Sequence, residues 1–402
     1  MRPLDGIRII ELASYVAAPA ATRLLADWGA EVIKVEAEEG DPFRTNGVLY
    51  KMPIKAEDEN PCFDTVSANK KFISVNMKTP EGKEIIDRLM ESADVFVTNT
   101  RIKSLVKLGY NYERIKDKFP KLIFAHVSGY GEQGPEKDTA GYDFTSYFAR
   151  GGITGTLYEK GTSPVNHAAA YGDFQASVCL ASGICAALYA RTITGLGDKI
   201  SVSLYHTAVY MMNLNVSASQ FGRAYPISRK ESTNPNQLTY KTLDERWVAI
   251  CMPDHARHYN RFVATIGRPD LVDHPIFMDI QKMQDTGKNR ELIAIIEEQL
   301  IKKPIDEWMR IFKENDISCE KAYLWNEILE DEQAWANDSL RKVQYPSGEE
   351  LTMVNTPVKI ESMDLPDFRT ARGVGFNTNE LLEEMGYSRG ELDVLRERKV
   401  IK

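Results

Sequence analysis

The chain has 402 residues, of which 43% are hydrophobic and 27% charged, and its formal net charge is −8. This length exceeds the size at which a single core usually stops growing, so two domains are expected. The acidic balance argues against nucleic acid as a partner. We expect no membrane partner either, because no apolar run approaches the roughly 20 residues that a span needs. Five cysteines without Cys-x-x-Cys spacing favour a reducing, cytoplasmic location.

Strand and helix patterns alternate along the first half of the chain. Strands are predicted at residues 7–12, 31–36, 72–77, 94–98, 122–127 and 199–205. Helical patterns separate them, which predicts an α/β fold with a doubly wound, Rossmann-like parallel sheet. Ligands of such sheets bind beyond the carboxyl ends of the strands. The loops at residues 15–17, 99–100 and 128–143 are therefore candidates for the ligand site. The turn at residues 13–19 lacks the glycine fingerprint of dinucleotide-binding folds, which argues against NAD or FAD.

The second half has a different pattern. Residues 223–236 are rich in Pro, Ser, Asn and charge, which is typical of a linker. A strand at 247–252 and several amphipathic helices follow it, which indicates a smaller α+β domain. We therefore expect a large Rossmann-like domain at residues 1–222, the smaller domain at 223–325, and a C-terminal segment at 326–402 that returns to the large domain.

Asp173 stands directly before residues 174–190, a helical stretch that is apolar on every side. Such a helix is normally buried. The simplest interpretation of Asp173 is a helix N-cap, but a partly desolvated carboxylate beside a helix N-terminus can also act as a nucleophile. Gly172 permits close backbone approach at this point. Asp143 is a second acid, for which a cap of the helix at 144–150 and a functional role are equally open.

Other kinds of catalytic site lack support. The six histidines show no metal-ligand spacing, so no metal site is expected. The sequence contains neither a Gly-x-Ser-x-Gly elbow nor a P-loop, which argues against a serine hydrolase and a P-loop nucleotide site.

A set of short motifs recurs in order along the chain. They lie at residues 3–7 (PLDGI), 25–36 (LADWGAEVIKVE), 69–71 (NKK), 76–82 (NMKTPEG), 129–135 (GYGEQGP), 141–143 (GYD) and 172–173 (GD). No single motif is decisive, but the ordered set is specific. Over essentially its whole length the chain resembles the family III CoA-transferases, the group related to formyl-CoA transferase.

The resemblance implies roles for particular residues. Asp173 matches the catalytic aspartate, which forms acyl-anhydride and aspartyl-CoA thioester intermediates. Asp143 matches an acid near that nucleophile, and Tyr142 and Gly172 complete the expected catalytic set. Positions that match CoA contacts are Val16, Val75, Met77, Lys78, Asn99, Thr100 and Lys107. The resemblance further implies a CoA thioester as substrate, no tightly bound cofactor, and an interlocked homodimer.

Residues 149–161 and 329–338 resemble a narrower branch of this family. Its members move CoA from an enoyl-CoA to an (R)-2-hydroxy acid in anaerobic amino-acid fermentation, with phenyllactate or 2-hydroxyisocaproate as typical acceptors. Val16 and Ala37 replace a glutamine and an arginine of formyl-CoA transferase. These departures favour a larger, less polar acid than formate or oxalate.

Two alternatives belong to other classes. The chain also resembles α-methylacyl-CoA racemases around Asp173, but those enzymes carry a histidine at the position of Tyr142. Tyrosine is a poor general base near neutral pH, which argues against an isomerase. A CoA-binding protein without turnover would keep the CoA loops but would not need Gly172 and Asp173 before an apolar helix.

Overall fold

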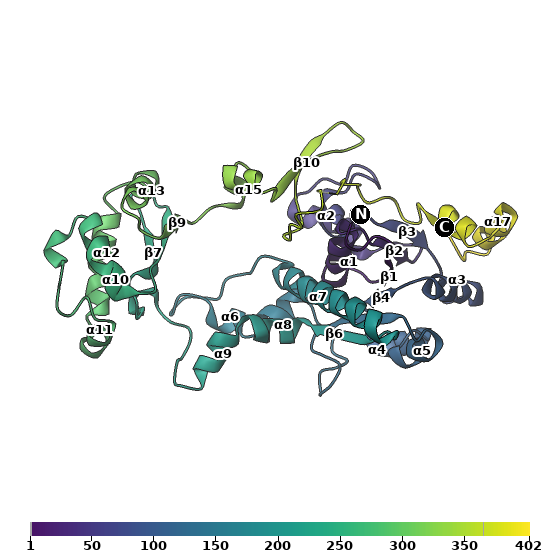
Figure 1. Cartoon of the computed structure of the whole chain (residues 1–402), viewed down its shortest axis with the longest axis horizontal. Helices are drawn as coiled ribbons and strands as arrows, with labels where there is room; N and C mark the ends of the chain where they lie inside the picture. Colours follow the sequence, from purple (N-terminus) through teal and green to yellow (C-terminus); the bar gives the residue numbers. More distant parts are fainter. Residues whose placement is uncertain (1, 365) are drawn as a thin grey trace. The chain divides into compact units, whose positions relative to one another are not determined.

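The computed structural model describes residues 2–364 and 366–402 (Figure 1). The chain forms two compact units. Unit 1 comprises Met1–Ile153, Asn166–Ala218 and Glu332–Lys402, and unit 2 comprises Thr154–Val165 and Ser219–Asp331. That residues 1–222 and 223–325 form separate domains, with a C-terminal segment at 326–402, stays a prediction.

Unit 1 is built on a six-stranded sheet in the order β3-β2-β1-β4-β5-β6, in which every neighbouring pair is parallel. The strands are β1 (Arg8–Leu12), β2 (Glu31–Glu36), β3 (Lys71–Ser74), β4 (Val95–Thr98), β5 (Ile123–Ser128) and β6 (Lys199–Ser203). The strand order reverses direction between β1 and β4, which opens a crevice beyond their carboxyl ends. The predicted α/β class with a doubly wound parallel sheet is confirmed.

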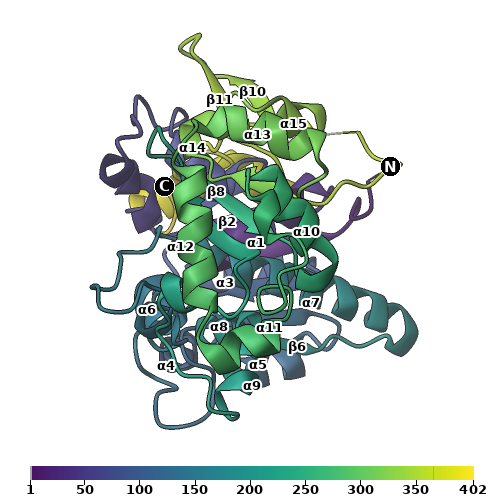
Figure 2. The ribbon, with the colours of Figure 1, turned by 90° about the vertical axis from the view of Figure 1, so that its left-hand side faces the viewer.

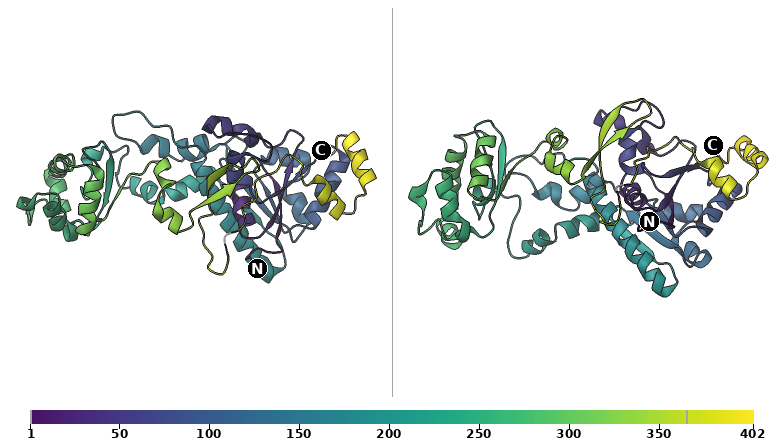
Figure 3. Two further views of the ribbon diagram at one scale, coloured as in Figure 1. Left: turned by 90° about the horizontal axis from the view of Figure 1, so that it is seen from above. Right: turned by 45° about the horizontal axis from the view of Figure 1, so that its top comes forward.

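Alternating residues of the strands pack into two separate hydrophobic cores. Ile9 and Val95 pack in one core with residues of α1 (Ala17–Asp27) and α7 (Tyr171–Thr194). Ile10 and Phe96 pack in the other core with α3 (Pro80–Glu91) and the C-terminal helices. Figure 3 shows these C-terminal helices, α16 (Thr378–Glu384) and α17 (Arg389–Glu397), in yellow beside the sheet of unit 1. The remaining elements of unit 1 are η1 (Pro42–Tyr50), α2 (Pro61–Ser67), α4 (Ile102–Leu108), α5 (Tyr112–Lys118), η2 (Asp143–Ala149), α8 (Leu204–Met211), α9 (Asn213–Ser219), α15 (Glu332–Ala336) and the hairpin β10 (Leu340–Gln344) with β11 (Glu350–Val354).

The edge strand β3 is closed by residues far along the chain. The backbone N–H of Phe72 donates to Asn377 Oδ1 at 3.0 Å, and the N–H of Asn377 donates back to the Phe72 carbonyl at 2.9 Å. The N–H of Ser74 donates to Thr378 Oγ1 at 3.2 Å. A bridge between Val75 and Ile401 continues this edge. Pairing of this kind protects a strand from uncontrolled association.

Four charged side chains are buried where β1 leads into α1. Lys34 Nζ lies 2.6 Å from Glu11 Oε1 and 2.8 Å from Asp41 Oδ2. Lys70 Nζ lies 2.7 Å from Glu11 Oε2. Burial opposes ionisation of Glu11, but the two ammonium charges outweigh it and hold the pKa of Glu11 at about 2. Lys34 also donates to the backbone carbonyl of Ala13 at 2.8 Å, so the buried charge cluster fixes the loop after β1.

Helix α7 is only partly buried, contrary to the prediction. Leu180 and Ile184 face the core, whereas Val178, Tyr189 and Ile193 are 46%, 70% and 73% exposed. In the described part of the chain, α7 is also the one helix long and apolar enough to cross a membrane, with 33% of its most apolar window buried. The expectation of no such run was therefore wrong, although a helix of a globular core passes the same test.

Unit 2 has an antiparallel sheet in the order β7-β8-β9. Its strands are β7 (Gln237–Lys241), β8 (Trp247–Cys251) and β9 (Cys319–Lys321), and its helical elements are α6 (Ile153–Thr156), η3 (Arg229–Glu231), α10 (His255–Thr265), η4 (Pro269–Leu271), α11 (Ile280–Thr286), α12 (Asn289–Leu300), α13 (Ile305–Glu314) and α14 (Trp325–Ile328). Figure 2 shows α10, α12 and α13 of this unit. Their apolar faces share one core with the sheet, including Tyr240 and Phe262. This arrangement agrees with the predicted α+β character.

Replacing Lys70 by methionine tests the buried charge cluster. The substitution leaves part of the Glu11 charge unpaired inside the fold, so stability should fall by about 3–5 kcal/mol. Differential scanning calorimetry measures the change. The matched control is Lys103→Met on the exposed side of α4, which should change stability by less than about 0.5 kcal/mol. Equal stability of Lys70→Met and wild type would contradict the role given to the cluster.

Candidate active site

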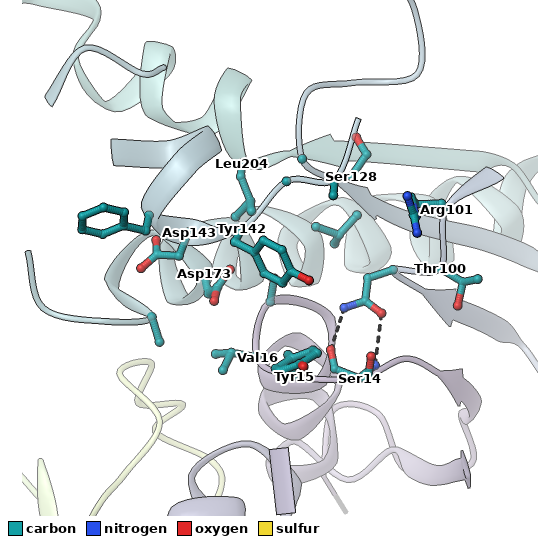
Figure 4. Close-up of a pocket in the computed structure, with 18 of the residues that line it drawn as sticks. Ser14, Tyr15, Val16, Thr100, Arg101, Ser128, Tyr142, Asp143, Asp173 and Leu204 are labelled. Atoms are coloured by element: carbon teal, nitrogen blue, oxygen red, sulfur yellow. Dashed lines mark hydrogen bonds between the residues drawn. The ribbon is translucent and has the colours of Figure 1, made fainter. Parts of the chain in front are cut away.

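A cavity of about 620 Å³ lies in unit 1 where the strand order reverses. Its walls come from the loops after β1, β4 and β5, from η1, and from the starts of η2 and α7. Asp173, Asp143 and Tyr142 line it, together with Val16, Asn99 and Thr100. Figure 4 shows both aspartates close to Tyr142, with Thr100 on another wall.

Asp143, and not Asp173, caps helix α7. The N-cap residue is Ala170, with φ at +65°, and Asp173 is the third residue inside the helix. The carboxylate of Asp143 reaches across to accept a hydrogen bond from the Gly172 N–H at 2.9 Å. Backbone groups of Ala170 and Asp173 add to this capping. The simplest interpretation of Asp173, a helix N-cap, is therefore wrong. Of the two interpretations left open for Asp143, a cap of the helix at 144–150 is also wrong, because Tyr142 occupies the N-cap position of η2.

Gly172 is required by close packing. A Cβ atom at this position would lie 2.2 Å from Tyr147 Cγ and 2.4 Å from Asp143 Oδ1. Both distances are far below van der Waals contact, so a larger residue would displace the Asp143 carboxylate from the helix N-terminus. Glycine thus allows Asp143 to take over the capping of α7.

The two carboxylates differ in their surroundings. Burial, with the nearby negative charge of Asp143, raises the pKa of Asp173 to about 7. Burial also raises the pKa of Asp143, to about 6, although hydrogen bonds from the backbone of Gly172, Ala170 and Asp173 oppose this rise. In the described part of the chain, the Asp173 carboxylate accepts no hydrogen bond, because the backbone donors at the helix N-terminus serve Asp143. Asp173 is therefore a desolvated carboxylate whose oxygens remain available for reaction.

Aromatic side chains form the walls next to these carboxylates. The rings of Tyr15 and Tyr142 meet edge to face, with centroids 6.2 Å apart and an interplanar angle of 87°. Phe43, Tyr50 and Phe144 also line the cavity. This part of the cavity suits an apolar group.

Cationic and polar groups line another part of the cavity. Arg101 and Lys137 belong to its wall, as do Ser128 and Glu132. Figure 4 places Arg101 and Ser128 on the side away from the two aspartates. Glu132 Oε1 lies 2.8 Å from Nδ1 of His126 and also accepts from Ser201 at 2.9 Å. These bonds fix the glycine-rich loop after β5 against the sheet.

The structure brings together only some of the predicted CoA contacts. Val16, Asn99 and Thr100 line the cavity, but the amide of Asn99 is engaged with the backbone of Ser14. The other four positions lie outside the cavity lining: Val75 and Met77 pack in the second core, and Lys78 and Lys107 are exposed on the surface. Their roles stay predictions.

Sequence reasoning gave no individual role to Tyr15, Arg101 and Lys137, which line the cavity. Tyr15 and Lys137 lie in the loops 15–17 and 128–143, which the rule on the carboxyl ends of the strands had selected. Arg101 follows directly after the third selected loop, 99–100. In the described part of the chain, no group of three or more His, Cys, Asp or Glu side chains is placed to hold a metal ion.

The cavity has the features of an acyl-transfer site: an available carboxylate, an apolar wall and cationic groups for phosphates. Residues 4–373 match CoA-transferase family III, so the chain belongs to this family of enzymes.

Several relatives carry informative names. The chain is 45% identical over 400 residues to the cinnamoyl-CoA:phenyllactate CoA-transferase of Clostridium sporogenes, covering 99% of this chain and 97% of the relative. It is 41% identical over 399 residues to the (R)-2-hydroxy-4-methylpentanoate CoA-transferase of Clostridioides difficile, covering 99% of both. Among solved structures, a CAIB/BAIF family protein from Brucella suis superposes with a TM-score of 0.80 at 26% identity, covering 96% of this chain and 99% of the other.

Removing the charge of Asp173 should change how stability depends on pH. Its pKa in the folded state, about 7, is higher than in an unfolded chain, so ionisation destabilises the fold as pH rises from about 4 to about 7. Asp173→Asn should therefore melt a few degrees above wild type at about pH 8, with little difference at about pH 4. Thermal melts of both proteins at the two pH values measure this. Asp138→Asn, at an exposed position of the same unit, is the control, and a gain from Asp173→Asn that is equal at both pH values would contradict the assignment.

Proposed function

We propose that this enzyme moves CoA from an acyl-CoA or 2-enoyl-CoA to a free (R)-2-hydroxy carboxylic acid, with Asp173 as the acyl carrier. The observation that carries this proposal is the carboxylate of Asp173, desolvated and free of hydrogen bonds in the described structure, in the wall of a cavity lined by aromatic and cationic side chains. The names of the two clostridial relatives support the substrate class, because both act on 2-hydroxy acids with an apolar side chain.

The reaction needs no cofactor other than its own CoA thioester substrate. An oxygen of Asp173 attacks the thioester carbonyl, the C–S bond breaks, and CoA leaves as a thiolate from a mixed anhydride. The thiolate attacks the aspartyl carbonyl, which releases the donor acid and leaves an aspartyl-CoA thioester. The carboxylate of the hydroxy acid then attacks this thioester, the C–S bond breaks, and CoA leaves again as a thiolate from a second anhydride. The thiolate finally takes the acyl group of the hydroxy acid and restores the Asp173 carboxylate.

The capping by Asp143 supports this role of Asp173. A carboxylate that accepted the helix N-terminal hydrogen bonds would be stabilised as an anion and would be a weaker nucleophile. Asp143 accepts the Gly172 N–H instead, and its charge also raises the pKa of Asp173. Gly172 and Tyr142 serve the site by positioning these two acids.

The CoA moiety is assigned to the cationic side of the cavity. Arg101 and Lys137 supply charges that suit its phosphates, and Val16, Asn99 and Thr100 border the path to Asp173. CoA binds as a substrate in this proposal, with no tightly held cofactor and no nucleic-acid or membrane partner, in a cytoplasmic enzyme.

An interlocked homodimer accounts for the exposed apolar side of α7. Val178, Tyr189 and Ile193 of this helix are exposed, and Tyr210 and Leu214 of the next two helices are 68% and 81% exposed. Many exposed apolar side chains on three consecutive helices are typical of a protein interface. A second copy of the chain would bury it.

Sedimentation velocity tests the homodimer. Wild type should sediment as a dimer, and Ile193→Asp should weaken the association because it places a charge in an apolar interface. The control is Val106→Asp, at a 57% exposed position on α4, which should leave the dimer intact. A monomeric wild type at micromolar concentration would refute the homodimer.

Trapping the enzyme intermediate tests the acyl carrier. Wild type incubated with cinnamoyl-CoA and then with hydroxylamine should gain a hydroxamate on Asp173, because both proposed intermediates are activated acyl groups. Peptide mass spectrometry locates the modification. Asp173→Ala should lose transfer activity by at least about a thousandfold, as expected when a covalent nucleophile is removed.

The control for this experiment is Asp138→Asn, which should be trapped and should turn over like wild type. Full transferase activity of Asp173→Ala, or a hydroxamate on Asp143 in place of Asp173, would overturn the assignment. An assay of (R)-2-hydroxy acids against simple fatty acids as acceptors, with one acyl-CoA donor, tests the substrate class separately.

A further inference from the structure

Tyr15 has a backbone conformation that aromatic residues rarely adopt. Its φ is +62°, in the left-handed region where a bulky side chain is strained and where glycine is the usual residue. Strain of this kind persists when the surroundings enforce it, and it often marks a functional residue. The presence of a tyrosine at this position therefore calls for a role of its side chain.

Buried polar groups hold the loop around Tyr15 in place. The Tyr15 N–H donates to Asp41 Oδ1 at 3.1 Å, and Asp41 is itself paired with Lys34 in the buried charge cluster. On the preceding residue, the Ser14 N–H donates to Asn99 Oδ1 at 3.1 Å, and Asn99 Nδ2 donates to the Ser14 carbonyl at 2.6 Å. The strained conformation is thus fixed by the segments that follow two other strands, β2 and β4.

The enforced conformation makes the Tyr15 ring part of the cavity wall. Tyr15 is 38% exposed and lines the same cavity as Asp173, and its ring meets the ring of Tyr142 edge to face. Val16, which follows it, is 4% exposed and adds a second apolar surface to the wall. Figure 4 shows Tyr15 and Val16 on the loop that enters α1, with Tyr142 and Asp173 on the other walls.

We propose that Tyr15 determines which acids the enzyme accepts, by forming with Tyr142 an aromatic wall for the side chain of the 2-hydroxy acid. The inference rests on the proposed function, because it places the acid beside Asp173. An aryl or branched alkyl side chain packs against both rings and excludes water from them. A methyl side chain is too small to cover the two rings, which then stay in contact with water. Small acids are therefore poor acceptors.

The test compares two acceptors with one acyl-CoA donor, in wild type and in Tyr15→Ala. The acceptors are (R)-2-hydroxy-4-methylpentanoate and (R)-lactate, which share the hydroxy acid group and differ in the apolar side chain. Loss of a well-packed apolar contact changes the ratio of kcat/KM values for two competing substrates by about 10–200-fold. Tyr15→Ala should therefore lower the ratio of kcat/KM values for the two acids by at least about tenfold, mainly through KM for the larger acid.

Two further variants separate recognition from general damage. Tyr15→Phe should keep the ratio of wild type because it keeps the ring. Phe376→Ala, which removes an exposed aromatic ring that does not line the cavity, should also keep it. An equal loss for both acids in Tyr15→Ala, or an unchanged ratio, would overturn the inference.

Stability and binding supply independent results. Tyr15→Gly should melt above Tyr15→Ala, because only glycine relieves the strain at positive φ, while both variants lose selectivity. Calorimetric titration of the two acids into wild type and Tyr15→Ala gives the same comparison without turnover. Absence of transfer to any acid would refute the proposed function, whereas equal affinity of wild type for the two acids would refute the role of Tyr15.

Discussion

The charge cluster beneath the first loop is the constraint on which the cavity depends. Glu11, Lys34, Lys70 and Asp41 are buried together, and their charges balance. Charges in such a place are costly unless all partners are present, so the cluster forms only when β1, β2 and the residues before β3 are in register. Its outer hydrogen bonds reach the backbone of Ala13 and the residues after it. The precision of the site therefore comes from an ionic core that does not itself line the cavity.

The start of α7 divides two tasks between two acids. A helix N-terminus offers unpaired backbone donors. A single aspartate there would accept hydrogen bonds from these donors with its own carboxylate. Here the capping oxygen comes from Asp143, which lies 29 positions earlier in the chain, and Asp173 keeps a raised pKa within the same helix turn. Gly172 makes this division possible because a side chain at its position would collide with the Asp143 carboxylate.

Much of the fold could be predicted from the sequence because it follows from local patterns. Alternating strands and helices indicated the parallel sheet, and each of the six predicted strands overlaps a strand of that sheet. The site was only partly predictable, since its decisive contacts join distant residues. The capping of α7 by Asp143 has no local signal, and the strained Tyr15 depends on Asp41. The exposed side of α7 was missed because composition reports apolarity but not which neighbour covers it.

The closure of the β3 edge has a consequence for how the protein is made. Strand β3 obtains its outer hydrogen bonds from Asn377 and Thr378, about three hundred residues later in the chain. While the ribosome is still adding the intervening residues, at about 5–20 per second, the nascent sheet has an open edge. Chaperones that shield strand edges would be needed most during this interval. Translation that stops between the end of α7 and residue 377 would leave chains prone to aggregate even though Asp143 and Asp173 are already present.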